Sequence, residues 1–145
     1  WLLSFVSTSW QPARQWLLWV FVAMALSAST VALVKHFSHH ACPYDLQIYS
    51  GKAPRLGFFE AMPEGMLPGR CWPGGHASTA FSLFGFYFAA RHAGRRRLAM
   101  GILVFVIALG VILSFVQVMR GAHFLSHQVW TALICWWVSQ IVLSR

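Results

Sequence analysis

The stretch LAMGILVFVIALGVILSFV, residues 98–116, contains no charged side chain. A membrane-crossing helix needs about 20 mostly apolar residues, so this stretch predicts a transmembrane span near 98–117. Further apolar stretches predict three more spans, near 16–34, 76–91 and 124–143. The span near 76–91 is short for a full crossing and would have to start near His76 and tilt. The sequence therefore predicts an all-α integral membrane helix bundle with at least four transmembrane spans, in one domain over 1–145.

The composition agrees with a membrane protein. Of the 145 residues, 58% are hydrophobic and only 10% are charged, whereas soluble domains average about 25% charged residues. The 11 Lys and Arg exceed the 3 Asp and Glu, which gives a net charge of +8. Because these bases are scattered between apolar stretches, we expect membrane lipids and a phosphate-bearing ligand as partners rather than nucleic acid. Nothing indicates an obligatory protein partner, and the start at Trp1 leaves room for an upstream span.

The segment 35–75 is polar and contains five prolines, which predicts a long loop between the first two spans. The short connector RHAGRRR, residues 91–97, is strongly basic and should therefore remain in the cytoplasm. The loop then lies on the other side, facing the periplasm or the exterior of a bacterial inner membrane. This topology brings five polar residues to that same membrane face: Lys35, His76, Arg120, His123 and His127.

Two of the three cysteines bracket the exported loop. Cys42 and Cys71 could pair there, because disulfides persist in oxidising compartments; the alternative is two free thiols. Cys135 lies inside the last span and is interpreted as a small apolar residue of a helix interface.

The stretch around 117–127 carries polar residues at helical spacing. Gln117, Arg120, His123 and His127 follow one another at three or four positions, which places them on one helix face. Ionisable groups at membrane depth are functional by default. The simpler interpretation is an interfacial cluster that contacts lipid phosphates.

A second polar group precedes the span near 76–91. Gly74 and Gly75 come just before His76, and N–H groups at the start of a helix suit the binding of an anion. A metal site would be the competing explanation for the histidines, because His36 and His40 stand four apart, as do His123 and His127. The only acids are Asp45, Glu60 and Glu64, too few for bridging carboxylates. We therefore expect no metal and no cofactor.

Three motifs in series resemble those of the type 2 phosphatidic acid phosphatase family, which shares its fold with vanadium haloperoxidases. The family pattern is Lys-six residues-Arg-Pro, then Pro-Ser-Gly-His, then Ser-Arg-five residues-His-three residues-Asp. The chain has KHFSHHACP at 35–43, PGGH at 73–76 and VQVMRGAHFLSH at 116–127, with His123 at the position of the pattern's histidine. The order, the spacing and the position relative to the spans match from Lys35 to the C-terminus.

The chain departs from the pattern at several positions, which makes it a divergent member. The differing residues are Cys42 for Arg, Gly74 for Ser, Val116 and Gln117 for Ser-Arg, and His127 for Asp. Two phosphate-binding arginines are thus missing from their expected places. Arg120, one turn from Gln117, is the hypothesised replacement, with Lys52, Arg55 and Arg70 as weaker candidates for the other.

The resemblance implies a role for each matching residue. His123 is the expected nucleophile that forms a phosphohistidine, His127 orients it in place of the carboxylate, and His76 is the expected general acid. The phosphate would be held by Lys35, Arg120, the backbone of Gly74 and Gly75, and Gln117.

The sequence therefore predicts a metal-independent membrane phosphatase that hydrolyses a lipid phosphate or lipid pyrophosphate. Three alternatives remain open. The protein could bind lipid headgroups with weak or no catalysis, since two arginines and the carboxylate are replaced. It could be a transport subunit whose histidines relay protons, or, by resemblance alone, a haloperoxidase that uses bound vanadate.

Overall fold

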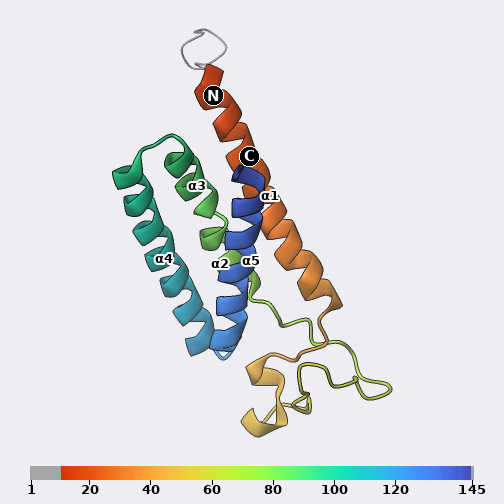
Figure 1. Cartoon of the computed structure of the whole chain (residues 1–145). Helices are drawn as coiled ribbons and strands as arrows, with labels where there is room; N and C mark the ends of the chain where they lie inside the picture. The colour runs from red at the N-terminus through yellow and green to blue at the C-terminus, as the bar shows by residue number, and fades with distance from the viewer. Residues whose placement is uncertain (1–10, 145) are drawn as a thin grey trace.

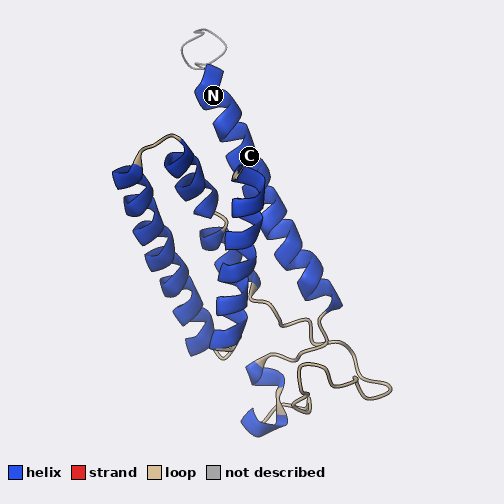
Figure 2. Ribbon diagram, in the orientation of Figure 1, coloured by secondary structure: helices blue, strands red, loops and turns tan. Residues whose placement is uncertain are grey.

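The computed structural model describes residues 11–144, and within that range the chain is all-helical without a β-strand (Figure 2). The elements, in chain order, are α1 (Gln11–Phe37), the short 3-10 helices η3 (Pro43–Asp45) and η4 (Gln47–Tyr49), α2 (Gly75–Phe81), α3 (Phe84–His92), α4 (Arg96–Met119) and α5 (Leu125–Leu143).

Two helices are long and apolar enough to cross a membrane, α1 from Arg14 to Phe37 and α4 over its full length. Their outer faces expose large apolar side chains, among them Leu33 on α1 and Phe105 on α4. Such faces are unfavourable in water and suit contact with lipid tails. Both helices coincide with spans predicted from the sequence.

α5 buries one face against α1, α2 and α3 and packs much less against α4, while its other face exposes large apolar side chains such as Trp137 and Ile141. Apart from Gln128, its buried residues recur at every fourth position: His127, Thr131, Cys135, Ser139 and Leu143. Mostly small or polar side chains on this face let neighbouring helices approach closely, as in membrane bundles. The same polar residues lower the hydropathy of α5, so a full crossing by this helix stays a prediction.

The segment expected to form one span near 76–91 is instead two short helices in series, α2 and α3. The helix tightens at the junction, where the N–H of Leu83 donates to the carbonyl of Ala80 and the hydroxyl of Ser82 donates to the carbonyl of Thr79. The break lets Phe81 and Phe84, on either side of it, join one buried cluster that includes Val106 of α4. The burial of these two aromatic rings therefore favours the break over a continuous helix.

The two ends of the bundle differ. The α4–α5 connector and the long segment 38–74 lie at the end where α1 finishes, whereas the basic α3–α4 connector lies at the opposite end (Figure 1). The base of the long segment is closed by three backbone hydrogen bonds, in which the N–H groups of 69–71 donate to the carbonyls of 38–40. This closure holds residue 71 against the end of the bundle.

Candidate functional site

A turn at Gly121 brings His123 back over the end of α4. Gly121 has a φ of +65°, a left-handed conformation that glycine adopts without strain. Its N–H donates to the carbonyl of Val118, and the N–H of Ala122 donates to that of Gln117, which together form a Schellman motif. The N–H of His123 also donates to the Gln117 carbonyl, at 3.3 Å. The helix end thus fixes the backbone of His123 before α5 begins.

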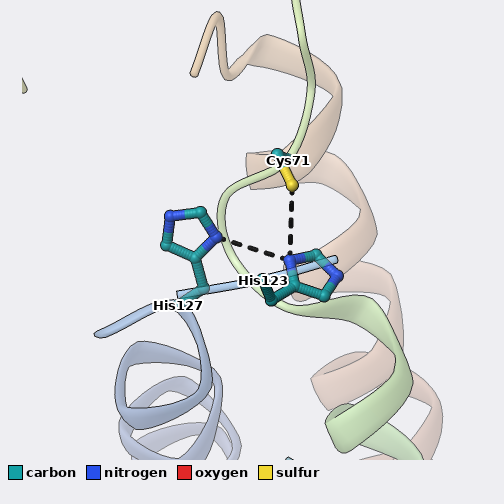
Figure 3. Close-up of side chains that lie close together, drawn as sticks. All are labelled: Cys71, His123 and His127. Atoms are coloured by element: carbon teal, nitrogen blue, oxygen red, sulfur yellow. Dashed lines mark hydrogen bonds between the residues drawn. The ribbon is translucent and has the colours of Figure 1, made fainter. Parts of the chain in front are cut away.

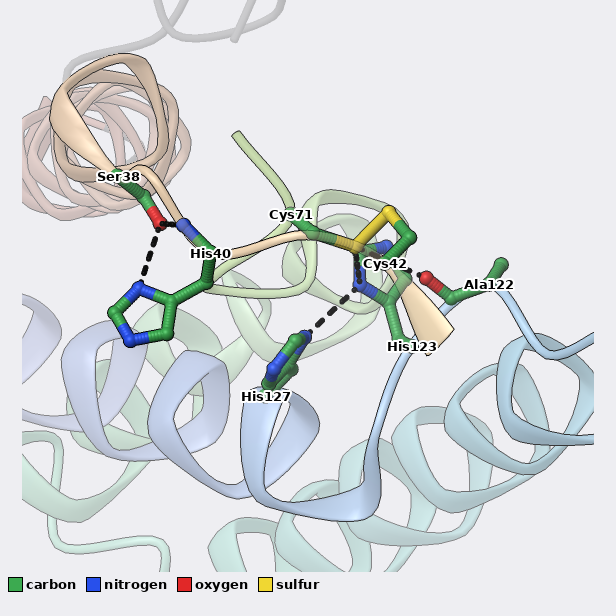
Figure 4. The surroundings of a disulfide bond; sticks show 7 residues. All are labelled: Ser38, His40, Cys42, Cys71, Ala122, His123 and His127. Atoms are coloured by element: carbon green, nitrogen blue, oxygen red, sulfur yellow. Dashed lines mark hydrogen bonds between the residues drawn. A yellow bond between two sulfur atoms is a disulfide. The ribbon is translucent and has the colours of Figure 1, made fainter. Parts of the chain in front are cut away.

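A disulfide between Cys42 and Cys71 lies directly over this turn (Figure 4). The sulfur of Cys71 is 3.4 Å from Nδ1 of His123 and 3.1 Å from the carbonyl oxygen of Ala122. A disulfide sulfur has no proton to donate, so these are packing contacts, with at most a weak acceptor role toward the imidazole. The disulfide therefore packs the long segment against the imidazole of His123.

His123 and His127 form a buried pair, only 4% and 5% exposed. Their Nδ1 atoms are 3.4 Å apart (Figure 3). Two neutral imidazoles can share this hydrogen bond only if one Nδ1 carries a proton and the other does not. If His123 donates, its Nε2 keeps a free lone pair, which is the form a nucleophile needs. His127 can thus act as the neutral acceptor expected at its position.

Lys35 of α1 and the exposed His76 at the start of α2 both influence this pair. Burial, followed by the electrostatic effects of Lys35 and His76, lowers the pKa of His123 to about 4. These electrostatic effects place both residues near His123, although they come from α1 and α2. The ammonium group of Lys35 also lies against Gly75, because a Cβ at that position would be 3.5 Å from Nζ. Lys35 therefore lies beside Gly75, and the exposed His76 follows Gly75 in the first turn of α2.

The backbone of Gly74 is already used within the fold. Its N–H donates to the carbonyl of His127 at 3.2 Å, and its carbonyl accepts from the hydroxyl of Thr131 at 2.9 Å. The expected binding of a phosphate by the N–H of Gly74 is therefore not available in this geometry. The donors that remain are the first N–H groups of α2, at Gly75 and His76, which no helical carbonyl can accept.

The other two residues expected to bind the phosphate, Gln117 and Arg120, differ from each other in exposure. Gln117 is buried, 6% exposed, and its Oε1 has no partner among the described residues. Arg120 caps the C-terminus of α4 with an exposed side chain. In the described part of the chain, no hydrogen bond or ion pair connects its guanidinium to the histidines. The displaced arginine proposed from the sequence is thus at the correct end of the bundle but points to the surface.

Beside the histidine pair lies a cavity of about 410 Å³ that sequence analysis did not identify. Its lining includes His127 and Arg55 together with aromatic rings, among which Trp72 packs edge-on against both Phe58 and Trp130. The paired aromatic rings come from distant segments, so no local sequence pattern indicates the cavity. Arg55 is the arginine that lines it.

Ligand atoms of Cys71, His123 and His127 lie within 4.8 Å of one another, as in a metal site. The disulfide, however, prevents Cys71 from forming the thiolate that a metal binds. Two imidazoles remain, fewer than the three or four protein ligands of a zinc site. In its oxidised form this cluster therefore does not fit a zinc ion.

Comparison with known proteins gives one match. A family model described as the PAP2 superfamily matches residues 16–144, which is nearly the whole chain. No curated protein and no solved structure matches the chain. The matched range includes all three motifs and every residue of the site described above.

Proposed function

The chain belongs to the PAP2 superfamily, and on that premise we propose that it is a membrane phosphatase for a lipid phosphate or lipid pyrophosphate, working through a phosphohistidine without a metal ion. The superfamily generally comprises phosphatases, which supports a phosphoric ester hydrolase. The observation that carries the proposal is a buried His123 whose pKa is lowered to about 4, with Lys35 and the imidazole of His76 close enough to contribute to that shift.

In the first step, Nε2 of His123 attacks the phosphorus atom and the bond from phosphorus to the ester oxygen breaks. His76 donates a proton to the departing oxygen, so the lipid leaves as an alcohol, or as a monophosphate from a pyrophosphate. The hydrogen bond to His127 stabilises the positive charge that develops on the His123 ring. Lys35 and the N–H groups that begin α2 are positioned to offset charge on the phosphoryl oxygens.

In the second step, water attacks the phosphohistidine while His76 accepts a proton from it. The bond from nitrogen to phosphorus breaks, inorganic phosphate leaves and the electron pair returns to His123. The cycle restores both histidines to their starting protonation states, so no further reactant is needed.

The membrane setting favours an amphiphilic substrate. The site lies at one end of a bundle whose α1 and α4 are apolar enough to cross a bilayer. A phosphate group at that level can remain attached to a tail that stays in lipid. The basic connector at the opposite end would remain in the cytoplasm, so the site would face the periplasm or the exterior.

The test is phosphate release from a panel of lipid phosphates by the parent protein, in the presence of a metal chelator. We expect His123→Ala to abolish release and His76→Ala to reduce it about 10²–10⁴-fold. His36→Ala is the matched control, because His36 is exposed at the same end of the molecule, and it should behave as the parent. If His123→Ala hydrolyses as fast as the parent, the proposed role of this residue is wrong.

The second candidate function is binding of a lipid headgroup without turnover. It is favoured by one observation, the exposed position of Arg120, which leaves the histidine pair without that guanidinium. In that case the parent protein binds lipid phosphates in vesicles but releases no phosphate, and His123→Ala leaves binding intact.

A further inference from the structure

Gln128 is a buried polar side chain whose bonding the fold leaves unexplained. It follows His127 in the first turn of α5 and is 2% exposed. Neither its Oε1 nor its Nε2 has a hydrogen-bond partner in the described part of the chain. Burying an unmatched polar group costs free energy that an apolar side chain of similar size would avoid. Such an exception calls for an explanation, and a polar ligand would provide one.

The amide of Gln128 occupies the space beside Gly74. A Cβ at residue 74 would overlap the Gln128 carboxamide, with Nε2 only 2.9 Å away. The backbone of Gly74 cannot move aside, because its N–H and its carbonyl are both bonded to α5. The space beside the Gly74 backbone can therefore hold either a side chain at position 74 or the amide of Gln128, and in this chain the amide occupies it. This space adjoins the segment that leads into His76.

On its other side, Gln128 lines an apolar groove of about 640 Å³ at the α4–α5 interface. The walls come from α2, α4 and α5 and include Phe81, Phe115 and Trp136; the polar residues among them are Ser114 and Gln128. α4 and α5 contact each other less than most helix pairs of the bundle. A hydrocarbon tail suits such walls. The aliphatic part of Gln128 thus borders the groove, while its buried amide packs against Gly74, beside the segment that leads into His76.

We propose that Gln128 is a substrate-binding residue: its amide N–H groups donate to an oxygen of the phosphate head of a long-chain alkyl or prenyl phosphate whose tail lies in the α4–α5 groove. This assignment rests on the proposed phosphatase function and names the substrate class of that same site. The head would then contact the amide beside Gly74, next to the segment that leads into His76. Binding a substrate would give the buried amide the partner that the protein itself does not supply.

The first test compares Gln128→Leu with the parent protein. The leucine keeps similar bulk and removes both unmatched polar atoms, so we expect a melting temperature equal to or above that of the parent. The kcat/KM for a long-chain alkyl phosphate should fall about 10–100-fold, as for loss of a hydrogen bond to a charged group. The matched control is Ser139→Ala, which removes an unpartnered buried hydroxyl from the same helix; it should leave kcat/KM unchanged. Unchanged kcat/KM in Gln128→Leu, or a fall in activity that only follows lost stability, would overturn the proposal.

The second test exchanges the polar group between the two positions. Gly74→Ser alone should lose activity, because its side chain overlaps the amide, and Gln128→Ala alone should lose the donor. The double variant Gly74→Ser/Gln128→Ala has room for the hydroxyl and should recover kcat/KM at least tenfold over Gln128→Ala. A folded double variant without any recovery would count against a donor role.

The two proposals fail in distinguishable ways. If the parent protein releases no phosphate, the phosphatase function fails and the role of Gln128 fails with it. If the parent is active, His123→Ala is inactive and Gln128→Leu equals the parent, only the role of Gln128 is wrong.

Discussion

Opening the Cys42–Cys71 disulfide tests how the long segment supports the site. The change is made by dithiothreitol, or by the double variant Cys42→Ala/Cys71→Ala. In both cases residue 71 loses its covalent link to residue 42. After reduction, the contact between the Cys71 sulfur and His123 is no longer held in place. In the double variant, the sulfur itself is absent. The three backbone hydrogen bonds between 38–40 and 69–71 remain.

The size of the effect follows from the length of the closed loop. The two cysteines are 29 residues apart, for which the chain-entropy relation gives about 3.5 kcal/mol. This is an upper limit, because α1 and α2 pack against each other and hold the loop ends close even when the loop is disordered. Since 1.4 kcal/mol is a factor of ten, amide exchange within 43–68 should rise by up to a few hundredfold.

Hydrogen exchange of the loop and phosphate release are measured on the same sample, oxidised and reduced. We expect faster exchange confined to 43–68 and a lower kcat, because the ring of His123 is held less well. Cys135→Ala, which removes the buried free thiol of α5, controls for other effects of the reductant. The reasoning is refuted if reduction leaves both loop exchange and phosphate release within twofold of the oxidised protein.

Three further predictions follow from the geometry. Burial holds the pKa of His123 at about 4, below its usual 6.5, so the acid limb of kcat/KM should lie near pH 4. The free energy of unfolding should rise with pH between 4 and 6.5, because in that range only the unfolded imidazole binds a proton. A pH profile of kcat/KM with its midpoint at 6.5 would contradict this. Micromolar Zn²⁺ should leave the oxidised protein active but bind and inhibit the reduced one, because reduction frees the thiolate of Cys71 beside two imidazoles; equal zinc binding in both states would be evidence against it. Gly110→Ala should destabilise the fold by about 1–3 kcal/mol, because its Cβ would overlap the ring of Phe81. Gly101→Ala should not, because a Cβ there would meet no other atom. Equal melting temperatures of the two variants would contradict this prediction.

The helices were predictable where apolar runs are long. The helical segments expected near 98–117 and 124–143 correspond to α4 and α5 within a few residues, although only α4 of these two is apolar enough to count as a membrane span. The break between α2 and α3 was not predictable, because it depends on where Phe81 and Phe84 pack in three dimensions. Local sequence contains no proline there, and the single glycine next to the junction, Gly85, is too weak a signal to indicate a break.

The site was partly predictable from motif spacing. His123 and His127 are in contact, and Lys35 and His76 are close enough to influence the pKa of His123. Their roles in a phosphate site stay predictions. The role suggested for Arg120 assumed that residues 117–127 share one helix face, but α4 ends at Met119 and the left-handed turn at residue 121 separates Arg120 from the histidines. The bonding of Gly74 depends on contacts with α5 that no local pattern contains. The choice between a disulfide and two free thiols is likewise decided by tertiary geometry.

The closed base of the long segment separates its tip from the rest of the molecule. Between the hydrogen bonds at 38–40 and 69–71, the chain makes an excursion that is exposed at Glu64 and Gly65, where a side chain added at Gly65 would meet no other atom. Extra residues introduced there lengthen the excursion without moving its two anchored ends. A fluorescent protein or an affinity tag could therefore be placed at this tip, reporting which side of the bilayer it occupies while the enzyme continues to work.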